Sequence, residues 1–234
     1  MFGTVLGLTA SIAWGGALGP WRDTPLAIDQ ASPIEALADV APPACAAVSR
    51  GMTQLPHRPD LYSLVNDANA WGAPYLTDLV LAVTEEMALL LPDADPILVG
   101  DISRRGGGPL FGHISHQQGI DVDLGLYTRG GKQNVGGFPN LGKANLDFEA
   151  SWLMIKSLLD SGRIEFILLD RTIIGLLRTW TIEEGRLTKS EAERIFPPEG
   201  TPHLWERSGY VRHADNHRDH IHVQVRCANG AASP

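Results

Sequence analysis

Residues 112–127 read GHISHQQGIDVDLGLY, and residues 203–225 read HLWERSGYVRHADNHRDHIHVQV. The first stretch holds two of the chain's eight histidines, and the second holds five. Each stretch ends in an alternation of apolar and polar residues, which is typical of a β-strand with one face in the core. The two stretches therefore predict strands that carry chemically active side chains on their other face.

The alternation assigns the polar side chains of each strand to one face. Positions 221, 223 and 225 are apolar and β-branched, so they should face the core and leave His220 and His222 together on the opposite face. In the same way, the apolar positions 120, 122 and 124 leave Asp121 and Asp123 on one face. Two strands of this kind can converge on a single metal ion.

The rest of the sequence supplies helices and loops around such strands. Apolar residues recur at helical spacing from Pro74 to Leu91, and Pro92 ends that helix. Further helices are expected over 148–159, 173–180 and 189–195, further strands over 97–102 and 164–169, and glycine-rich loops over 104–112 and 129–142. Because strands and helices do not alternate strictly, the pattern predicts an α+β fold, with a small central antiparallel β-sheet flanked by helices and long glycine-rich loops.

Composition excludes several classes of protein. Hydrophobic residues make up 44% of the 234 residues and charged residues 20%, as in an ordinary globular domain. The formal net charge is −8 and the chain has no basic run, so no nucleic-acid partner is expected. No stretch reaches the roughly 18 apolar residues that a membrane span needs, so no transmembrane segment is expected. The oligomeric state is left open by the sequence.

The N-terminal region is ambiguous. Residues 1–21 are apolar and small, like the hydrophobic region of a signal peptide, but the first basic residue, Arg22, follows them instead of preceding them. Residues 22–60 are rich in proline, alanine and aspartate and show no sustained apolar period. Two interpretations of residues 1–49 therefore remain: a leader that is a signal sequence or its remnant, and an extended arm.

The chain has two cysteines, Cys45 and Cys227. They form no CxxC motif, so a thiolate metal site is not expected. Two interpretations remain open for them. In an exported protein they would form one disulfide, and otherwise they would be two buried thiols.

Histidine gathered with aspartate suits a first-row metal, because neutral imidazole and carboxylate are good ligands for Zn²⁺. Catalytic zinc usually has three protein ligands and one open position. The natural division is therefore a histidine and an aspartate from the first stretch, with a third ligand and a general base from the second. At this point the residues alone do not decide which of His220 and His222 is the ligand.

The motifs carry a family resemblance. The pattern HxxGxDxD at 116–123, followed by HxH at 220–222, resembles the LAS group of zinc metallopeptidases. Within that group, SRRGGGPLFGH at 103–113, SHQQGIDVDL at 115–124 and HRDHIHVQVRC at 217–227 resemble the penicillin-insensitive murein endopeptidase family. The resemblance implies an LAS-type fold and a zinc metallopeptidase domain over 50–228, followed by a frayed tail at 229–234.

The resemblance also implies the roles of individual residues. It implies one Zn²⁺ per chain, held by His116, Asp123 and His222. His220 would be the general base, and His217 would be a second catalytic residue that stabilises the oxyanion in its protonated form.

Other residues near the motifs have less defined roles. His113 and Asp121 are expected to orient the ligands or to act as an additional ligand. Arg104 and Arg105 either bind carboxylates of an anionic peptide stem or are solvated loop charges. His203 and His213 lie outside the matched pattern and are expected to be surface or loop residues.

The implied function is that of a periplasmic or otherwise exported hydrolase whose substrates are the peptide stems of peptidoglycan. It would cleave the D-alanyl–meso-diaminopimelyl cross-link. Two alternatives remain. One is a D,D-carboxypeptidase or dipeptidase of the same fold group. Such enzymes typically have an ExxH motif, in which the glutamate is the base. The other is a non-catalytic, zinc-containing module that binds the cell wall.

Overall fold

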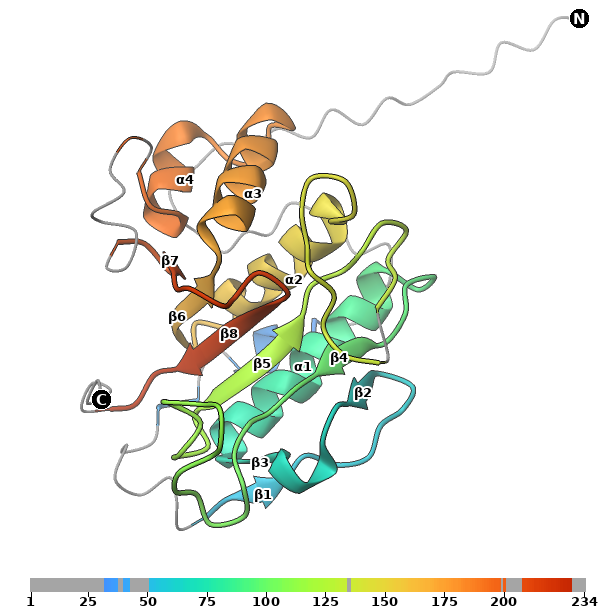
Figure 1. The fold of residues 1–234 in the computed structure, drawn as a ribbon, viewed down its shortest axis with the longest axis vertical. Helices are drawn as coiled ribbons and strands as arrows, with labels where there is room; N and C mark the ends of the chain where they lie inside the picture. The colour runs from blue at the N-terminus through green and yellow to red at the C-terminus, as the bar shows by residue number, and fades with distance from the viewer. Residues whose placement is uncertain are drawn as a thin grey trace, which may run out of the picture. The chain divides into compact units, whose positions relative to one another are not determined.

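The strand that bears Asp121 and Asp123 lies in the middle of a mixed β-sheet (Figure 1). This computed structural model describes residues 32–37, 40–42, 51–133, 136–198, 200 and 208–228. The predicted tail at 229–234, His203, Cys45 and most of the predicted leader or arm therefore lie outside the described residues.

Six strands of the described residues form the main sheet. In spatial order they are β2 (Tyr62–Leu64), β4 (Ile97–Val99), β5 (Asp121–Gly125), β8 (His220–Val225), β6 (Ile164–Leu169) and β7 (Val211–His213). A separate antiparallel pair joins β1 (Thr53–Gln54) to β3 (Trp71–Gly72). Two short 3₁₀ turns are η1 (Glu35–Leu37) and η3 (Asp67–Asn69).

The centre of the main sheet is antiparallel, as predicted, but its edges are not. Strands β4, β5, β8 and β6 pair antiparallel with one another, whereas β2 pairs with β4 and β7 pairs with β6 in parallel. The α+β class is confirmed. The edge strands were missed because each has only three residues, too few to show a period of two.

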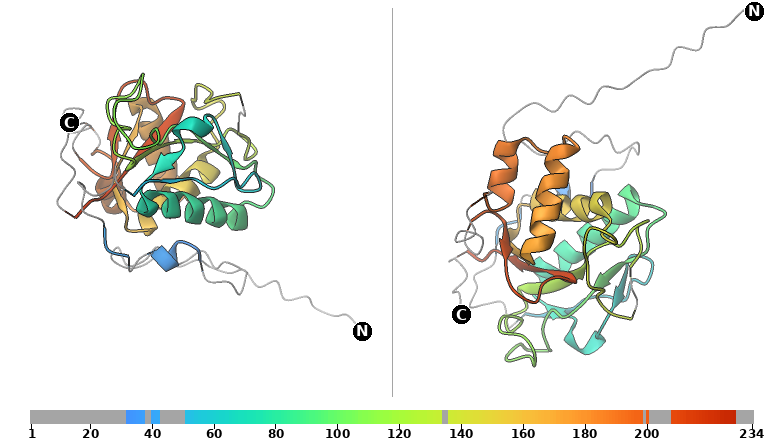
Figure 2. Two further views of the ribbon diagram at one scale, coloured as in Figure 1. Left: turned by 90° about the horizontal axis from the view of Figure 1, so that it is seen from below. Right: turned by 45° about the horizontal axis from the view of Figure 1, so that its top comes forward.

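Four helices of the described residues flank this sheet: α1 (Pro74–Leu90), α2 (Phe148–Asp160), α3 (Arg171–Glu183) and α4 (Lys189–Ile195). Helices α1 and α2 cover one face, whereas α3 packs against β7 at the edge of the sheet (Figure 1). Figure 2 shows α1 and α2 on one side of the sheet and the segment between β4 and β5 on the other. None of the described helices is long and apolar enough to cross a membrane.

Local signals explain where the helices begin. Helix α1 starts at a proline, which needs no partner for its missing N–H in the first turn. The Asp147 side chain accepts a hydrogen bond from the Ala150 N–H at the start of α2. At α4, Thr188 and Glu191 form a reciprocal capping box. The predicted helices are confirmed, and α3 extends beyond its predicted range at both ends.

The register of β5 against β8 sets the position of the polar side chains. Asp123 lies opposite His222, and Gly125 lies opposite His220. The intervening apolar residues are fully buried: Val122, Leu124, Ile221, Val223 and Val225 are 0–1% exposed. The predicted division into an apolar and a polar face is confirmed for both strands. The two polar faces are thereby adjacent on the side of the sheet away from α1 and α2.

Candidate metal centre

Three side-chain atoms form a small triangle on the polar face of β5 and β8. The Nε2 atom of His116 lies 3.2 Å from Oδ1 of Asp123 and 3.0 Å from Nδ1 of His222. The third edge, from Nδ1 of His222 to Oδ1 of Asp123, is 3.1 Å. Ligands of a tetrahedral Zn²⁺ lie about 3.3 Å apart, given metal–ligand distances of about 2.0–2.1 Å. The triangle therefore has nearly the size of one face of such a site.

The outer hydrogen-bond partners of the two histidines suit neutral rings whose lone pairs point into the triangle. The Nδ1 atom of His116 lies 2.9 Å from the backbone oxygen of Ile102, so Nδ1–H donates and Nε2 carries the lone pair. The Nε2 atom of His222 lies 3.1 Å from Oδ1 of Asp121, so a ring that binds a metal ion through Nδ1 would donate its Nε2–H to that carboxylate. With both rings neutral in this way, the three atoms of the triangle would each offer a lone pair to one metal ion. This donor set fits Zn²⁺.

Burial and charge at the triangle also favour a bound cation. His116, Asp123 and His222 are 1%, 3% and 3% exposed. Burial raises the pKa of Asp123, but hydrogen bonds from His116 and His222 outweigh it and hold that pKa below its ordinary value. Burial lowers the pKa of His222, but its hydrogen bonds with Asp121 and Asp123 outweigh it and raise that pKa to about 9. The buried carboxylates therefore favour positive charge here, from either a proton or a metal ion.

Asp121 lies behind His222 and does not belong to the triangle. Its Oδ1 atom accepts hydrogen bonds from Nε2 of His222, at 3.1 Å, and from Nε2 of Gln224, at 2.8 Å. A carboxylate on the far nitrogen of a metal-binding imidazole fixes the tautomer and the plane of the ring. Asp121 is thus placed to orient His222.

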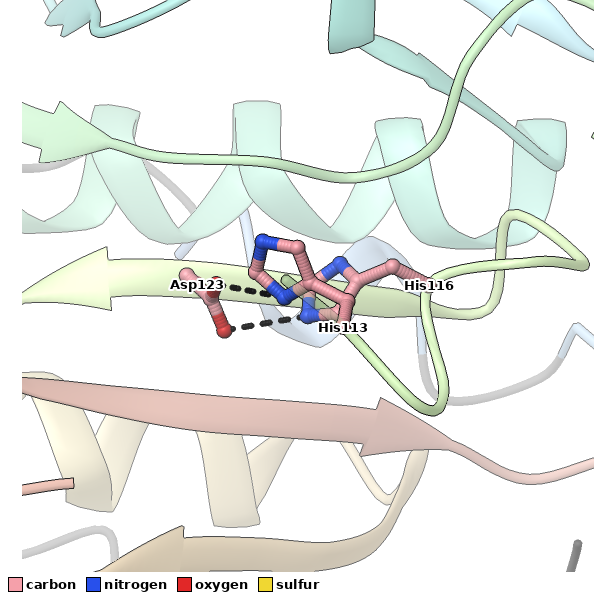
Figure 3. A group of neighbouring side chains, drawn as sticks. All are labelled: His113, His116 and Asp123. Atoms are coloured by element: carbon pink, nitrogen blue, oxygen red, sulfur yellow. Dashed lines mark hydrogen bonds and ion pairs between the residues drawn. The ribbon is translucent and has the colours of Figure 1, made fainter. Parts of the chain in front are cut away.

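His113 completes a second, overlapping group with His116 and Asp123, and these three residues can also hold a metal ion (Figure 3). The Nε2 atom of His113 lies 2.9 Å from Asp101, which also accepts a hydrogen bond from Asn69 at 2.8 Å. Its Nδ1 atom lies 3.8 Å from Oδ2 of Asp123. The triangle with His222 is the tighter of the two groups, and His113 lies at its edge.

His220 and His217 line the more open side of the triangle. The Nε2 atom of His220 lies 3.7 Å from Oδ1 of Asp123, and its Nδ1 atom lies 2.6 Å from Oδ1 of Asp219. The ring of His217 has its centre 5.0 Å from that of His220, and its Nδ1–H donates to the backbone oxygen of Asp215 at 2.7 Å. Five of the described histidines therefore gather at one point, as the two sequence stretches predict.

Phe138 packs against this cluster and was not singled out from the sequence. Its ring stacks on that of His220 at 5.0 Å, with 25° between the planes. Glycines beneath the ring make room for it, because a Cβ atom at Gly100 would lie 2.8 Å from Cζ of Phe138 and one at Gly125 would lie 3.4 Å from Cδ1. No local pattern marks this residue, since a long loop brings it to the sheet.

Three other residues from the sequence analysis lie outside the cluster. Arg104 donates from Nε to the backbone oxygen of Gly107 at 3.1 Å, which braces its own loop. Arg105 is exposed and lies over the ring of Trp71, 5.3 Å from its centre. The expectation that His213 is a surface or loop residue is wrong: it belongs to β7, is 5% exposed, and its Nδ1 accepts from the backbone N–H of Arg171.

Comparison with known proteins supports the resemblance. The sequence model of the family described as penicillin-insensitive murein endopeptidase matches residues 43–136, which include His113, His116 and Asp123. The stretch with His217, His220 and His222 lies beyond the matched segment. No curated protein matches the chain. The predicted family resemblance is thus confirmed, and over residues 43–136 the chain is similar to the penicillin-insensitive murein endopeptidases.

Proposed function

We propose that the protein is a zinc-dependent murein DD-endopeptidase that hydrolyses D-alanyl–meso-diaminopimelyl cross-links of peptidoglycan. One observation carries the proposal. A triangle of lone-pair atoms from His116, Asp123 and His222, with edges of 3.0–3.2 Å, lies beside a further imidazole nitrogen, Nε2 of His220. A ligand set with an adjacent base is what metal-assisted hydrolysis of an amide needs.

In this proposal each residue has one task. His116, Asp123 and His222 hold the ion, Asp121 orients His222, and His113 lies beside Asp123. A Zn²⁺ ion bound there polarises the scissile carbonyl and acidifies a water molecule. His220 accepts the proton from the attacking water at Nε2 and then gives it to the leaving nitrogen. A C–O bond forms, the C–N bond breaks, and the products are a carboxylate and an amine.

For His217 we propose a different form from the one that the resemblance implies. Burial is the main cause that lowers its pKa, so the ring is neutral near pH 7. Its Nδ1–H is already donated to the Asp215 carbonyl, so Nε2 carries a lone pair. We therefore assign neutral His217 as an acceptor for a water or a substrate N–H, in place of a protonated donor to the oxyanion.

The proposed substrate and compartment rest on several features. Peptide stems carry carboxylates, and Arg105 is an exposed cation on the loop that leads to His113 and His116. Arg104, on the same loop, would bind substrate only if it left Gly107. Cys227 is disulfide-bonded, which suits a periplasmic or otherwise exported protein. We place the catalytic domain at 50–228.

The alternatives have less support. A carboxypeptidase or dipeptidase of this fold group would need a glutamate as base, and among the described residues the group beside Asp123 on the open side is His220. A zinc module that only binds the cell wall would not need His220 and His217 beside the triangle.

Purified cross-linked muropeptide dimers separate the three functions. The protein is incubated with them, with and without a chelator, and the products are identified by liquid chromatography and mass spectrometry. The proposal predicts monomers that disappear with chelator and return when Zn²⁺ is added. Release of free D-alanine would favour the carboxypeptidase, and bound zinc without turnover would favour the binding module.

A further inference from the structure

Asp219 makes a short hydrogen bond to its neighbour His220. The distance from Oδ1 of Asp219 to Nδ1 of His220 is 2.6 Å, which is short for an N–H···O hydrogen bond. Asp219 directly precedes β8, in a bend, so the alternation of side chains along the strand does not separate the two residues. The carboxylate is 35% exposed and the imidazole is 16% exposed.

We infer that Asp219 is a positioning residue that holds neutral His220 in one tautomer, with the proton on Nδ1 and the lone pair of Nε2 directed at the metal triangle. The inference rests on the proposed function, because it names what makes His220 a base. A base must present a lone pair to the water it deprotonates, so an Nε2–H tautomer would be inactive.

Two carboxylates compete for the single proton of the neutral ring. Asp219 accepts it at Nδ1 over 2.6 Å, whereas Asp123 lies 3.7 Å from Nε2. The shorter contact favours Nδ1–H while Asp219 is present. Without Asp219, Asp123 is the nearer acceptor, and the proton would move to Nε2, where it blocks the base.

Phe138 restricts rotation of the His220 ring, which is the other change that the loss of Asp219 could cause. The stacked rings lie 5.0 Å apart, and Phe138 is itself seated over Gly100 and Gly125. This packing holds the plane of the His220 ring. The tautomer is therefore the property that Asp219 controls, while the orientation of the plane depends largely on Phe138.

Nitrogen NMR tests the tautomer directly in the zinc-loaded protein. Protonated and lone-pair imidazole nitrogens differ in ¹⁵N chemical shift, and a His220→Gln variant identifies the His220 signals. Wild type should show Nδ1–H on the neutral ring, and Asp219→Ala should show Nε2–H with bound zinc unchanged. Asp93→Ala, which removes an exposed aspartate after α1, is the charge-matched control and should resemble wild type.

Kinetics on cross-linked muropeptides test the consequence. Asp219→Ala should lower kcat by about 10²–10⁴-fold, the usual contribution of a general base, with KM close to wild type. Asp219→Glu keeps a carboxylate within reach and should restore part of kcat together with the Nδ1–H signal. A merely structural role would not give this joint recovery.

Two results would overturn the inference. One is an unchanged His220 tautomer in Asp219→Ala, and the other is loss of zinc from that variant. If wild type cleaves no cross-link, the proposed function fails instead, and the nitrogen shifts still decide whether Asp219 fixes the tautomer.

Discussion

Two aspartates that the fold shields from water have pKa values shifted in opposite directions. Asp123, in β5, has its pKa held below the ordinary value, whereas burial raises the pKa of Asp160, at the end of α2, to about 6. For both groups burial is the largest single cause, and it acts in the same direction. The difference therefore lies in what surrounds each carboxylate.

Asp123 is surrounded by imidazole nitrogens, with His116 and His222 within 3.2 Å of Oδ1. Asp160 has an ion pair with Lys156 at 2.7 Å, but its Oδ1 has no hydrogen-bond partner among the described residues, and Glu86 adds repulsion. The comparison teaches that a buried carboxylate alone does not make a cation site. The candidate site at Asp123 differs because nitrogen atoms of His116 and His222 converge on the same oxygen.

The largest expected effect comes from breaking the triangle. Asp123→Ala and His222→Ala each leave two of its three atoms, so bound zinc and cross-link cleavage should both be abolished. Metal content by mass spectrometry, together with the muropeptide assay, measures this. Stoichiometric zinc in His222→Ala would favour the group with His113, whereas stoichiometric zinc in Asp123→Ala would contradict both groups, because both contain Asp123.

Removing the base should separate turnover from metal binding. His220→Ala takes away the nitrogen 3.7 Å from Asp123 but leaves the triangle complete. We expect kcat to fall by about 10²–10⁴-fold while zinc stays bound. Full activity in this variant would show that His220 is not the base.

A smaller effect on zinc binding is expected from Asp121, which contacts His222 but lies outside the triangle. Asp121→Asn weakens the acceptor that fixes Nε2–H of His222 and should lower zinc affinity by about 10–100-fold. Competition with a metal-binding dye measures the affinity. An affinity equal to that of wild type would mean that strand pairing alone orients the ring.

The smallest effect concerns stability at Asp160. Because its folded pKa of about 6 lies above the unfolded value of about 3.9, the native state binds the extra proton between them. The free energy of unfolding should therefore fall as pH rises through this window, by a total of about 3 kcal/mol.

Asp160→Asn removes the ionisation and should flatten that part of the pH dependence. Urea unfolding with chelator present, at about pH 4 and pH 7.5, compares the variant with wild type and with Asp93→Asn at an exposed position. Identical pH dependence in all three proteins would show that Asp160 is not shifted.

Much of the fold could be predicted because it depends on local periodicity. The helix from Pro74, the strand over 164–169 and the helix over 189–195 all form where their patterns indicate. Strands β2 and β7 escaped prediction because hydrogen bonds to distant strands define them. The predicted strand over 97–102 is shorter, ending at Val99 before Gly100, where the ring of Phe138 needs the space of a missing Cβ.

The sequence by itself determined which side chains are available to the site. Alternation along β5 and β8 places Asp121, Asp123, His220 and His222 on polar faces, because side chains on a strand point alternately to its two sides. The two stretches also hold seven histidines, five of which build the cluster.

Only the tertiary structure decided the distances and the hydrogen-bond partners of the rings. Pairing Asp123 opposite His222 and folding the loop with His116 over them makes the triangle, since no local rule relates residues a hundred positions apart. The partners that orient the rings, Asp219 and the carbonyl of Ile102, become visible only in space. Directional hydrogen bonds depend on positions in three dimensions, and a sequence pattern gives only the face.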